Sequence, residues 1–165
     1  MSSKPVGVLF VCLGNICRSP AAEGIFRKLA QEAQVQDQLL IDSAGTSNYH
    51  IDEPPDPRML AAATHRGIAL EHLRTRQVTA ADFHRFDYVL CMDQRNLQAL
   101  RQVMPPDATA HVGLLMRYAP TAGFDEVPDP YFGDEAGFEF TLDLLTQACQ
   151  GLLDHMISQG KIIKG

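Results

Sequence analysis

The sequence has no apolar run long enough to cross a membrane. Its first apolar stretch, residues 6–12, is too short for a transmembrane helix, and it leads into Gly14, Asn15 and Arg18 rather than into a small-residue cleavage site. We therefore expect no targeting segment here and no association with a membrane.

Positive charge is also scarce. The formal net charge is -6 at pH 7, and the isoelectric point is near 5.4. Nucleic acids and anionic membranes both bind basic surfaces, so we expect neither as a partner. An anionic ligand would have to be captured by local groups rather than by a general positive field.

Cysteine and histidine do not occur at the spacings of a disulfide framework or a metal site. The cysteines form no CxxC pair, and a chain of this size can be stable on its core alone. The six histidines are scattered along the chain, which predicts no metal site. The cysteines are Cys12, Cys17, Cys91 and Cys149. We expect reduced thiols and a cytoplasmic location.

The chain also lacks linkers, internal repeats and low-complexity tracts. Its 165 residues are 45% hydrophobic, which is enough to bury a substantial core. We therefore expect residues 1–165 to form a single domain.

Four short apolar segments are predicted to be strands. The near-continuous apolar run at residues 6–11 is typical of a parallel strand that helices cover on both faces. The other strands are expected at residues 39–44, 88–92 and 110–115. A long loop should follow at residues 116–133.

Helices are predicted between and after these strands. Ser19 followed by Pro20 indicates a helix N-terminus, residues 58–66 form an alanine-rich helix that ends at Gly67, and Asp93 caps a third helix. An apolar stripe on the last helix is interpreted as core. It consists of Phe138, Leu142, Leu145, Cys149, Leu152 and Met156.

The alternation of strands and helices predicts an α/β fold. We expect a doubly wound, four-stranded parallel sheet with helices on both faces. Ligands bind such sheets outside the carboxyl ends of the strands, where the strand order reverses. The loop after the first strand is therefore the first place to look for a site.

The segment from Cys12 to Ser19 has the features of a phosphate-binding loop. It joins the first strand to the first helix, so its backbone N–H groups can converge on an anion at the positive end of that helix. Gly14 permits a close approach of the backbone, and Asn15 tolerates a left-handed conformation. The guanidinium of Arg18 can hold two phosphoryl oxygens in parallel.

Cys12 stands where a nucleophile would be needed. A helix N-terminus and a nearby arginine favour the thiolate, and Ser19 can donate its hydroxyl to that sulfur. Taken singly, Cys12 also fits a buried thiol at a strand end, and Arg18 fits a solvated arginine at a helix start. The combination of strand, glycine, arginine and helix favours phosphate chemistry.

Residues 12–20 read CLGNICRSP, which resembles the signature loop of the low-molecular-weight protein tyrosine phosphatases. Further similar segments are SAGTS at 43–47, RQ at 76–77, FDYVLCMD at 86–93 and DPY at 129–131. The resemblance implies a hydrolase that cleaves phosphotyrosine and small aryl phosphates through a phosphocysteine intermediate. In that mechanism Cys12 is the nucleophile, Arg18 the phosphate clamp and Asp129 the general acid.

The same resemblance assigns the other residues of the site. The loop would bind phosphate without a metal or organic cofactor, through Leu13, Gly14, Asn15, Ile16, Cys17 and Arg18. Asn15, Ser19, Ser43 and His72 would support the loop. Tyr49 and Tyr131 would line the substrate cleft, and Cys17 would form a reversible disulfide with Cys12.

Simpler interpretations of these residues remain open. Asp129 also fits an Asp-Pro turn, His72 a surface histidine, Cys17 a plain buried thiol, and the tyrosines a cover over core residues. The chain also departs from the family pattern in two places. The segment after His72 is about one residue longer than usual, and Phe132 stands where many members carry a second tyrosine.

The function predicted by these features is that of a protein tyrosine phosphatase. Its partners would be phosphotyrosine-containing proteins, and we expect a monomer that self-associates weakly at most. One alternative is a thiol-dependent arsenate reductase, which needs further cysteines on a mobile segment. Another is a phosphotyrosine-binding module without turnover, although the intact set of Cys12, Arg18, Ser19 and Asp129 argues against it.

Overall fold

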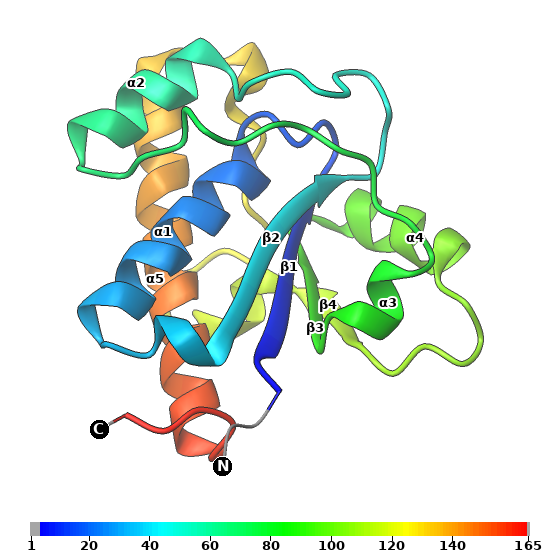
Figure 1. Ribbon diagram of the computed structural model, residues 1–165. Coiled ribbons are helices and arrows are strands. Elements are labelled where there is room, and N and C mark those ends of the chain that lie inside the picture. The colour runs from blue at the N-terminus through cyan, green and yellow to red at the C-terminus, as the bar shows by residue number, and fades with distance from the viewer. Residues whose placement is uncertain (1–3, 165) are drawn as a thin grey trace.

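The computed structural model describes residues 4–164, and at its centre is a parallel sheet. The strands are β1 (Val6–Cys12), β2 (Leu39–Gly45), β3 (Tyr88–Cys91) and β4 (His111–Leu114), in the order β2-β1-β3-β4. All three strand pairs are parallel, as predicted. The order reverses between β1 and β3, so the loop after β1 lies at the switch point (Figure 1).

Helices cover both faces of this sheet (Figure 1). One face carries α1 (Arg18–Glu32) and the long α5 (Glu135–Ser158), and α2 (Pro57–His65) packs against α5. The opposite face carries the short α3 (Asp82–Arg85) and α4 (Gln94–Val103). This arrangement confirms the predicted doubly wound α/β fold.

The apolar run of β1 supplies residues to two cores. Val8 and Phe10 pack on the α1 and α5 side, whereas Leu9 and Val11 pack on the α3 and α4 side. All four side chains are fully buried, and each contributes roughly 1.5–3 kcal/mol of burial free energy. Because both faces are covered, β1 is apolar at every position, and its end is held firmly.

The stripe of α5 is core, as predicted. Phe138, Leu142, Leu145, Cys149, Leu152 and Met156 are all buried. Gly151 lies on the same helix where it meets the 3₁₀ helix Leu115–Tyr118, and a Cβ there would lie only 1.8 Å from the carbonyl oxygen of Tyr118. The glycine therefore permits this close contact between α5 and the segment after β4.

The helix ends agree with the sequence except at α1. Asp93 forms a capping box with Asn96, and Gly67 follows α2 with a φ of 76°, as expected for a helix C-terminus. However, α1 begins at Arg18 with Cys17 as its N-cap, so the predicted cap at Ser19 is wrong. The hydroxyl of Ser19 is instead used by Cys12, at an Sγ–Oγ distance of 3.1 Å.

Several short elements were not predicted. Helix α3 is one, and 3₁₀ turns at Gln36–Gln38, Leu115–Tyr118 and Pro130–Phe132 are others. The last two fall on the segment predicted as a continuous loop, except for Leu115, which was predicted to end a strand. None of the helices within residues 4–164 combines the length and apolar character needed to span a membrane.

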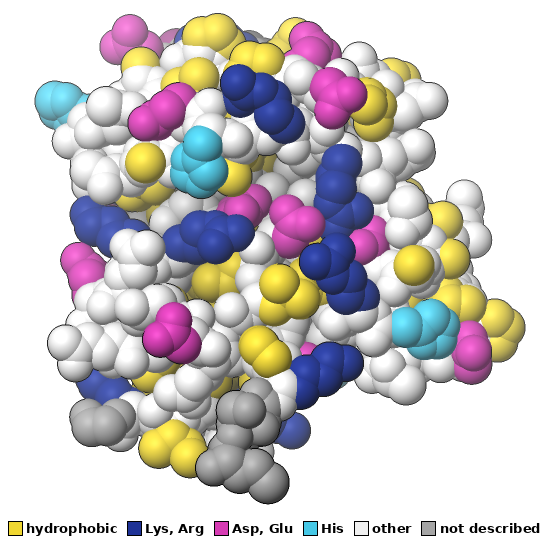
Figure 2. Space-filling model, in the orientation of Figure 1, with side chains coloured by type: hydrophobic (Ala, Val, Ile, Leu, Met, Phe, Trp, Pro, Cys, Tyr) yellow, Lys and Arg dark blue, Asp and Glu magenta, His cyan; other side chains and the backbone are white. Residues whose placement is uncertain are grey.

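Ion pairs flank β2, with their arginine side chains partly exposed and the carboxylates of Glu23 and Asp82 buried. Arg76 pairs with Asp42 and Asp82 at 3.1 and 3.0 Å, and Arg27 pairs with Glu23 at 2.8 Å. The face seen in Figure 2 accordingly shows acidic and basic side chains interspersed. Charge on this face is therefore locally neutralised rather than gathered into a basic patch.

Candidate active site

The loop between β1 and α1 is held from outside through its carbonyl groups. The carbonyl oxygens of Cys12, Leu13 and Ile16 accept backbone N–H bonds from Thr46, Ser47 and Asp56 at 2.8–3.0 Å. In contrast, the backbone N–H groups of residues 13–17 donate to no acceptor within the part of the chain described. A set of unused donors therefore lies at the N-terminus of α1, which is the arrangement that binds an anion.

Asn15 holds the bend of this loop. Its φ is 59°, in the left-handed region, as expected. Its side-chain Nδ2 donates to Ser19 Oγ at 2.8 Å and to Ser43 Oγ at 3.1 Å, while its Oδ1 accepts from the backbone N–H of Arg76 at 3.0 Å. The buried amide thus joins the loop to α1, β2 and the segment before α3.

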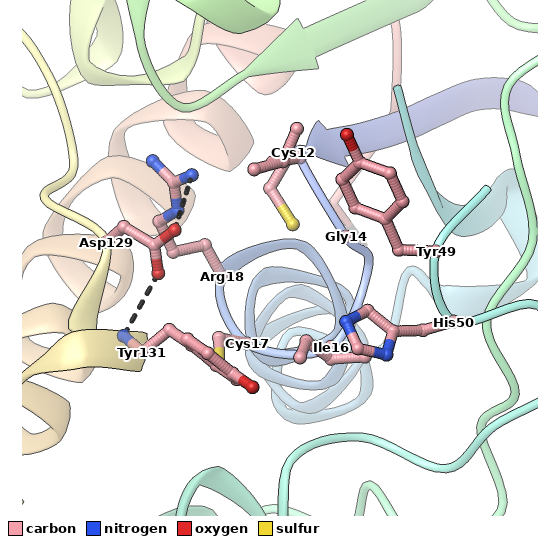
Figure 3. A pocket seen from close by; sticks show the side chains of 10 residues that line it. Cys12, Gly14, Ile16, Cys17, Arg18, Tyr49, His50, Asp129 and Tyr131 are labelled. Carbon is pink, nitrogen blue, oxygen red and sulfur yellow. Dashed lines mark hydrogen bonds and ion pairs between the residues drawn. The ribbon is translucent and has the colours of Figure 1, made fainter. Parts of the chain in front are cut away.

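Cys12 is the last residue of β1, and its side chain is almost fully buried. Its Sγ lies 3.1 Å from Ser19 Oγ and 3.5 Å from the backbone nitrogen of Ser19. Figure 3 shows the sulfur pointing into the space enclosed by the loop. Both contacts can donate hydrogen to a thiolate and would stabilise its charge.

Arg18 lies at the other end of the loop, with a side chain only 3% exposed. Its Nη1 donates to Asp93 Oδ2 at 2.8 Å and to the carbonyl of Val127 at 2.9 Å, and its Nη2 lies 3.5 Å from Asp129 Oδ2. Burial acts to lower the pKa of Arg18, but negative charge at Cys12 and the bond to Asp93 outweigh it. The pKa therefore lies above its ordinary value, and the guanidinium stays charged.

A cleft of about 190 Å³ opens above the loop. Arg18 and Asp129 lie on one side of the Cys12 sulfur and Tyr49 on the other, and Tyr131 also lines the cleft (Figure 3). Asp129 Oδ1 accepts the backbone N–H of Tyr131 at 3.1 Å, which fixes the carboxylate at the start of a 3₁₀ turn. The structure thus brings residues from three distant segments around one sulfur.

The structure does not bring His72 to the loop. His72 is exposed and makes no hydrogen bond within residues 4–164, so the supporting role expected for it is wrong. Arg76, in the segment that follows His72, provides the backbone N–H that Asn15 Oδ1 accepts. The support of the loop must therefore include a residue other than His72.

Glu23 is this additional supporting residue, and its role was not predicted from the sequence. Ser43 Oγ donates to Glu23 Oε1 at 2.7 Å, and Arg27 donates to Oε2 at 2.8 and 3.0 Å. Burial raises the pKa of Glu23, while the bonds from Ser43 and Arg27 oppose that shift. A continuous chain of hydrogen bonds therefore runs from a buried carboxylate through Ser43, Asn15 and Ser19 to the sulfur of Cys12.

Two more residues of the site had no clear signal in the sequence. Asp93 was expected only as a helix cap, but its second carboxylate oxygen also holds Arg18. His50 lines the cleft and lies 2.8 Å from Glu53 through its Nδ1. Asp93 follows the carboxyl end of β3, next to β1 in the sheet, which is the one cue that could have placed it here.

Gly45 is the tightest backbone contact of the loop. It pairs with Cys12 across the β1–β2 ladder, and a Cβ there would lie 2.8 Å from Leu13 O and 3.1 Å from Asn15 N. All these neighbours are backbone atoms, so the loop itself would have to move. We expect Gly45→Ala to lower kcat by roughly 10²-fold through misplaced loop amides, measured with p-nitrophenyl phosphate.

The control for this substitution is Gly113→Ala in β4. A Cβ at Gly113 meets no atom within 4 Å, so the same change should leave kcat unaltered. A Gly45→Ala protein with wild-type kcat would mean that the loop position has no influence on turnover.

The four cysteines are all free and buried, yet only two lie in the cleft. The pKa of Cys17 lies far above its ordinary value, mainly because the thiol is buried and secondly because of the negative charge of Asp56. Burial also raises the pKa of Cys91 to about 12, and it raises the pKa of Cys149 above its ordinary value. Cys91 and Cys149 are therefore inert core thiols.

The described residues include no group of three or more His, Cys, Asp or Glu side chains arranged to hold a metal ion. The donors that face the cleft are backbone amides and a guanidinium. Such donors bind an anion directly.

Comparison with known proteins points to one family. Residues 7–161 match the family described as low molecular weight phosphotyrosine protein phosphatase. A chicken protein with this description is 44% identical over 89% of this chain and 93% of its own length. The Bacillus subtilis low molecular weight protein-tyrosine-phosphatase YfkJ is 38% identical over 90% of this chain and 94% of its own length.

Solved structures show the same fold. A protein tyrosine phosphatase from Entamoeba histolytica, with Hepes in its active site, superposes with a TM-score of 0.89 at 38% identity, covering 94% of this chain and 99% of its own. A Drosophila arginine phosphatase superposes with a TM-score of 0.84 at 32% identity, covering 90% and 96%. These structures share the fold but are named for two different phosphorylated side chains.

Proposed function

The chain belongs to the low molecular weight phosphotyrosine protein phosphatases, a class of hydrolases, and we propose that Cys12, Arg18 and Asp129 carry out its phosphotyrosine hydrolysis. The observation that carries this proposal is the loop geometry. Unused amides of residues 13–17 surround the space into which the Cys12 sulfur points, with Arg18 at the far end. A phosphoryl group bound by these donors would therefore have its phosphorus next to the Cys12 sulfur.

In the first step the Cys12 thiolate attacks phosphorus. The bond from phosphorus to the phenolic oxygen breaks, its electron pair stays on that oxygen, and Asp129 supplies the proton. Loop amides and the Arg18 guanidinium stabilise the charge on the equatorial oxygens. The products are the dephosphorylated tyrosine side chain of the substrate and a phosphocysteine.

In the second step water attacks the phosphocysteine. Asp129, now a carboxylate, accepts a proton from that water, while the phosphorus–sulfur bond breaks and its electron pair returns to Cys12. Inorganic phosphate leaves, and both side chains are back in their starting states. Apart from the substrate and one water molecule, both steps use only groups of this chain, so the proposed mechanism requires no cofactor.

The walls of the cleft favour an aromatic leaving group. Leu13 and Ile16 present apolar side chains near the loop. Tyr49 is largely exposed and Tyr131 partly exposed at the entrance, where a phenyl ring could stack. A phosphoserine side chain is too short to reach these walls. Phosphoarginine, the substrate class suggested by the name of the Drosophila relative, would place a polar guanidine against apolar surface.

Arsenate reduction is disfavoured by the same structure. That reaction needs a relay of accessible thiols beyond the first, but Cys91 and Cys149 are fully buried in the core. A binding module without turnover is disfavoured because Asp129 lies at the cleft with its carboxylate next to Arg18. Catalysis accounts for both observations.

Some features of the proposal concern regulation and setting. Cys17 lines the same cleft as Cys12, which supports a reversible disulfide that would protect the nucleophile from further oxidation. Such a thiol enzyme suits the cytoplasm, and we propose a monomer acting on phosphotyrosine proteins there. Since the family match spans residues 7–161, we treat residues 1–165 as one phosphatase domain.

The role of Asp129 can be tested through the leaving group. We expect Asp129→Asn to slow hydrolysis of a phosphotyrosine peptide by roughly 10²–10⁴-fold, because tyrosine is a poor leaving group without a proton donor. An activated aryl phosphate should be slowed much less. The measurement is kcat for both substrates, with phosphoserine and phosphoarginine peptides alongside.

The matched control is Asp125→Asn, an exposed aspartate of the same loop that lies outside the cleft. It should leave both rates unchanged. Equal losses on the two substrates in Asp129→Asn would assign that residue a structural role, and faster hydrolysis of phosphoarginine than of phosphotyrosine would overturn the substrate class.

A further inference from the structure

A second hollow lies at the amino ends of the strands, whereas Cys12 lies at the carboxyl end of β1. Its volume is about 480 Å³, and Val6, Tyr88 and His111, the first residues of β1, β3 and β4, form one wall. Tyr118 and the C-terminal part of α5 form the other. In Figure 1 this is the edge near the labels N and C, away from the loop between β1 and α1. No residue lines both this hollow and the catalytic cleft.

Two tyrosine and histidine pairs provide hydrogen-bond donors to this space. The rings of Tyr88 and His111 meet edge to face with centroids 5.9 Å apart, and those of Tyr118 and His155 lie 5.2 Å apart. Neither hydroxyl nor either imidazole is hydrogen-bonded within residues 4–164. Burial raises the pKa of both tyrosines, and Tyr88 adds to the shift of Tyr118, so the hydroxyls stay protonated donors.

The charge of the hollow differs from that of the whole chain. Two of the four lysines in a protein of net charge -6, Lys4 and Lys161, lie on its lining. Neither forms an ion pair within the described part of the chain. The one carboxylate on the lining is Asp87, whose Oδ2 already accepts the backbone N–H of Gly7 at 2.8 Å. Two lysine ammonium groups therefore face this space against a single carboxylate, which already accepts a backbone N–H.

We propose that this hollow binds a small multivalent oxyanion. The ammonium groups of Lys4 and Lys161 supply the attraction, and the hydroxyls of Tyr88 and Tyr118 supply directed hydrogen bonds. A metal cation does not fit, because the lysines would repel it. Two kinds of ligand share the required chemistry, phosphate compounds and polycarboxylates, and pyrophosphate and citrate serve as their probes.

Histidine NMR can test this proposal in the full-length protein. His111 and His155 report on the hollow and His50 on the catalytic cleft, so one spectrum separates the two sites. Titration with pyrophosphate, and separately with citrate, at fixed pH and ionic strength should shift the His111 and His155 ring signals saturably. Single His111→Gln and His155→Gln variants assign those signals.

The lysines decide whether the charge of the hollow is responsible. In the double variant Lys4→Ala, Lys161→Ala the affinity should fall by about tenfold or more. Lys164→Ala removes the same charge close by in sequence but outside the hollow, and it should leave the affinity unchanged. The proposal is wrong if neither probe shifts His111 and His155 saturably, or if Lys164→Ala weakens binding as much as the double variant. Hydrolysis of p-nitrophenyl phosphate by these variants reports separately on the catalytic cleft.

Discussion

Replacing Cys12 with serine is expected to reduce kcat for p-nitrophenyl phosphate and phosphotyrosine peptides by at least about 10⁴-fold. The hydroxyl that would replace the sulfur is a far weaker nucleophile at neutral pH, because it is not ionised there. Ser19 Oγ at 3.1 Å from the sulfur supplies a hydrogen bond, not a base. The loss should therefore appear in turnover rather than in substrate affinity.

Binding provides the control for this variant. The loop amides and Arg18 are untouched in Cys12→Ser, so the protein should still bind a phosphotyrosine peptide, which calorimetry can measure. Retained binding with lost turnover would locate the defect in the chemical step. Undiminished hydrolysis would refute the assigned nucleophile, and loss of both would indicate that the loop has collapsed.

The substitution Arg18→Lys is expected to lower kcat/KM by roughly 10³-fold or more. Nη1 is committed to Asp93 and to the carbonyl of Val127, which leaves the other nitrogens of the planar guanidinium for phosphoryl oxygens. A lysine has a single ammonium group and cannot satisfy Asp93 and the phosphoryl group together in this geometry. Both binding of phosphate and stabilisation of the transition state should suffer.

An arginine outside the site serves as the comparison. Arg95 is exposed on α4, close in sequence to Asp93, and Arg95→Lys should leave kcat/KM unchanged. Thermal unfolding of Arg18→Lys would show whether the fold survives, since the charge is retained. A folded Arg18→Lys protein with kcat/KM within about threefold of wild type would contradict the clamp role.

Patterns that depend on neighbours in the sequence were predictable. The continuous apolar run of β1 predicts a strand buried on both faces, and the apolar stripe of α5 predicts a helix buried on one face. Both predictions are confirmed. The left-handed turn at Asn15 and the position of the loop at the switch point also follow from local chemistry and topology. In each case the physical cause lies within a few residues.

Features that depend on contacts between distant segments could not be predicted from the sequence. The sequence marks Glu23 only as a helix residue, because its partner Ser43, whose Oγ lies 2.7 Å from the carboxylate, belongs to the distant strand β2. No structural role of its own was predicted for Gly45, because its close approach to the Leu13 carbonyl involves a distant segment. His72 was assigned from resemblance, but its side chain is exposed and makes no hydrogen bond within residues 4–164. The support of the loop is tertiary, so no local pattern encodes it.

The central claim is that phosphate passes through Cys12, and rapid quenching tests it most directly. Wild-type protein would be mixed with excess p-nitrophenyl phosphate, quenched in acid within the first turnover, digested and analysed by mass spectrometry. We predict that the peptide containing Cys12 gains the mass of one phosphoryl group, and that Cys12→Ser shows no such gain. Turnover with Cys12 unmodified, or phosphate on another side chain, would contradict the mechanism.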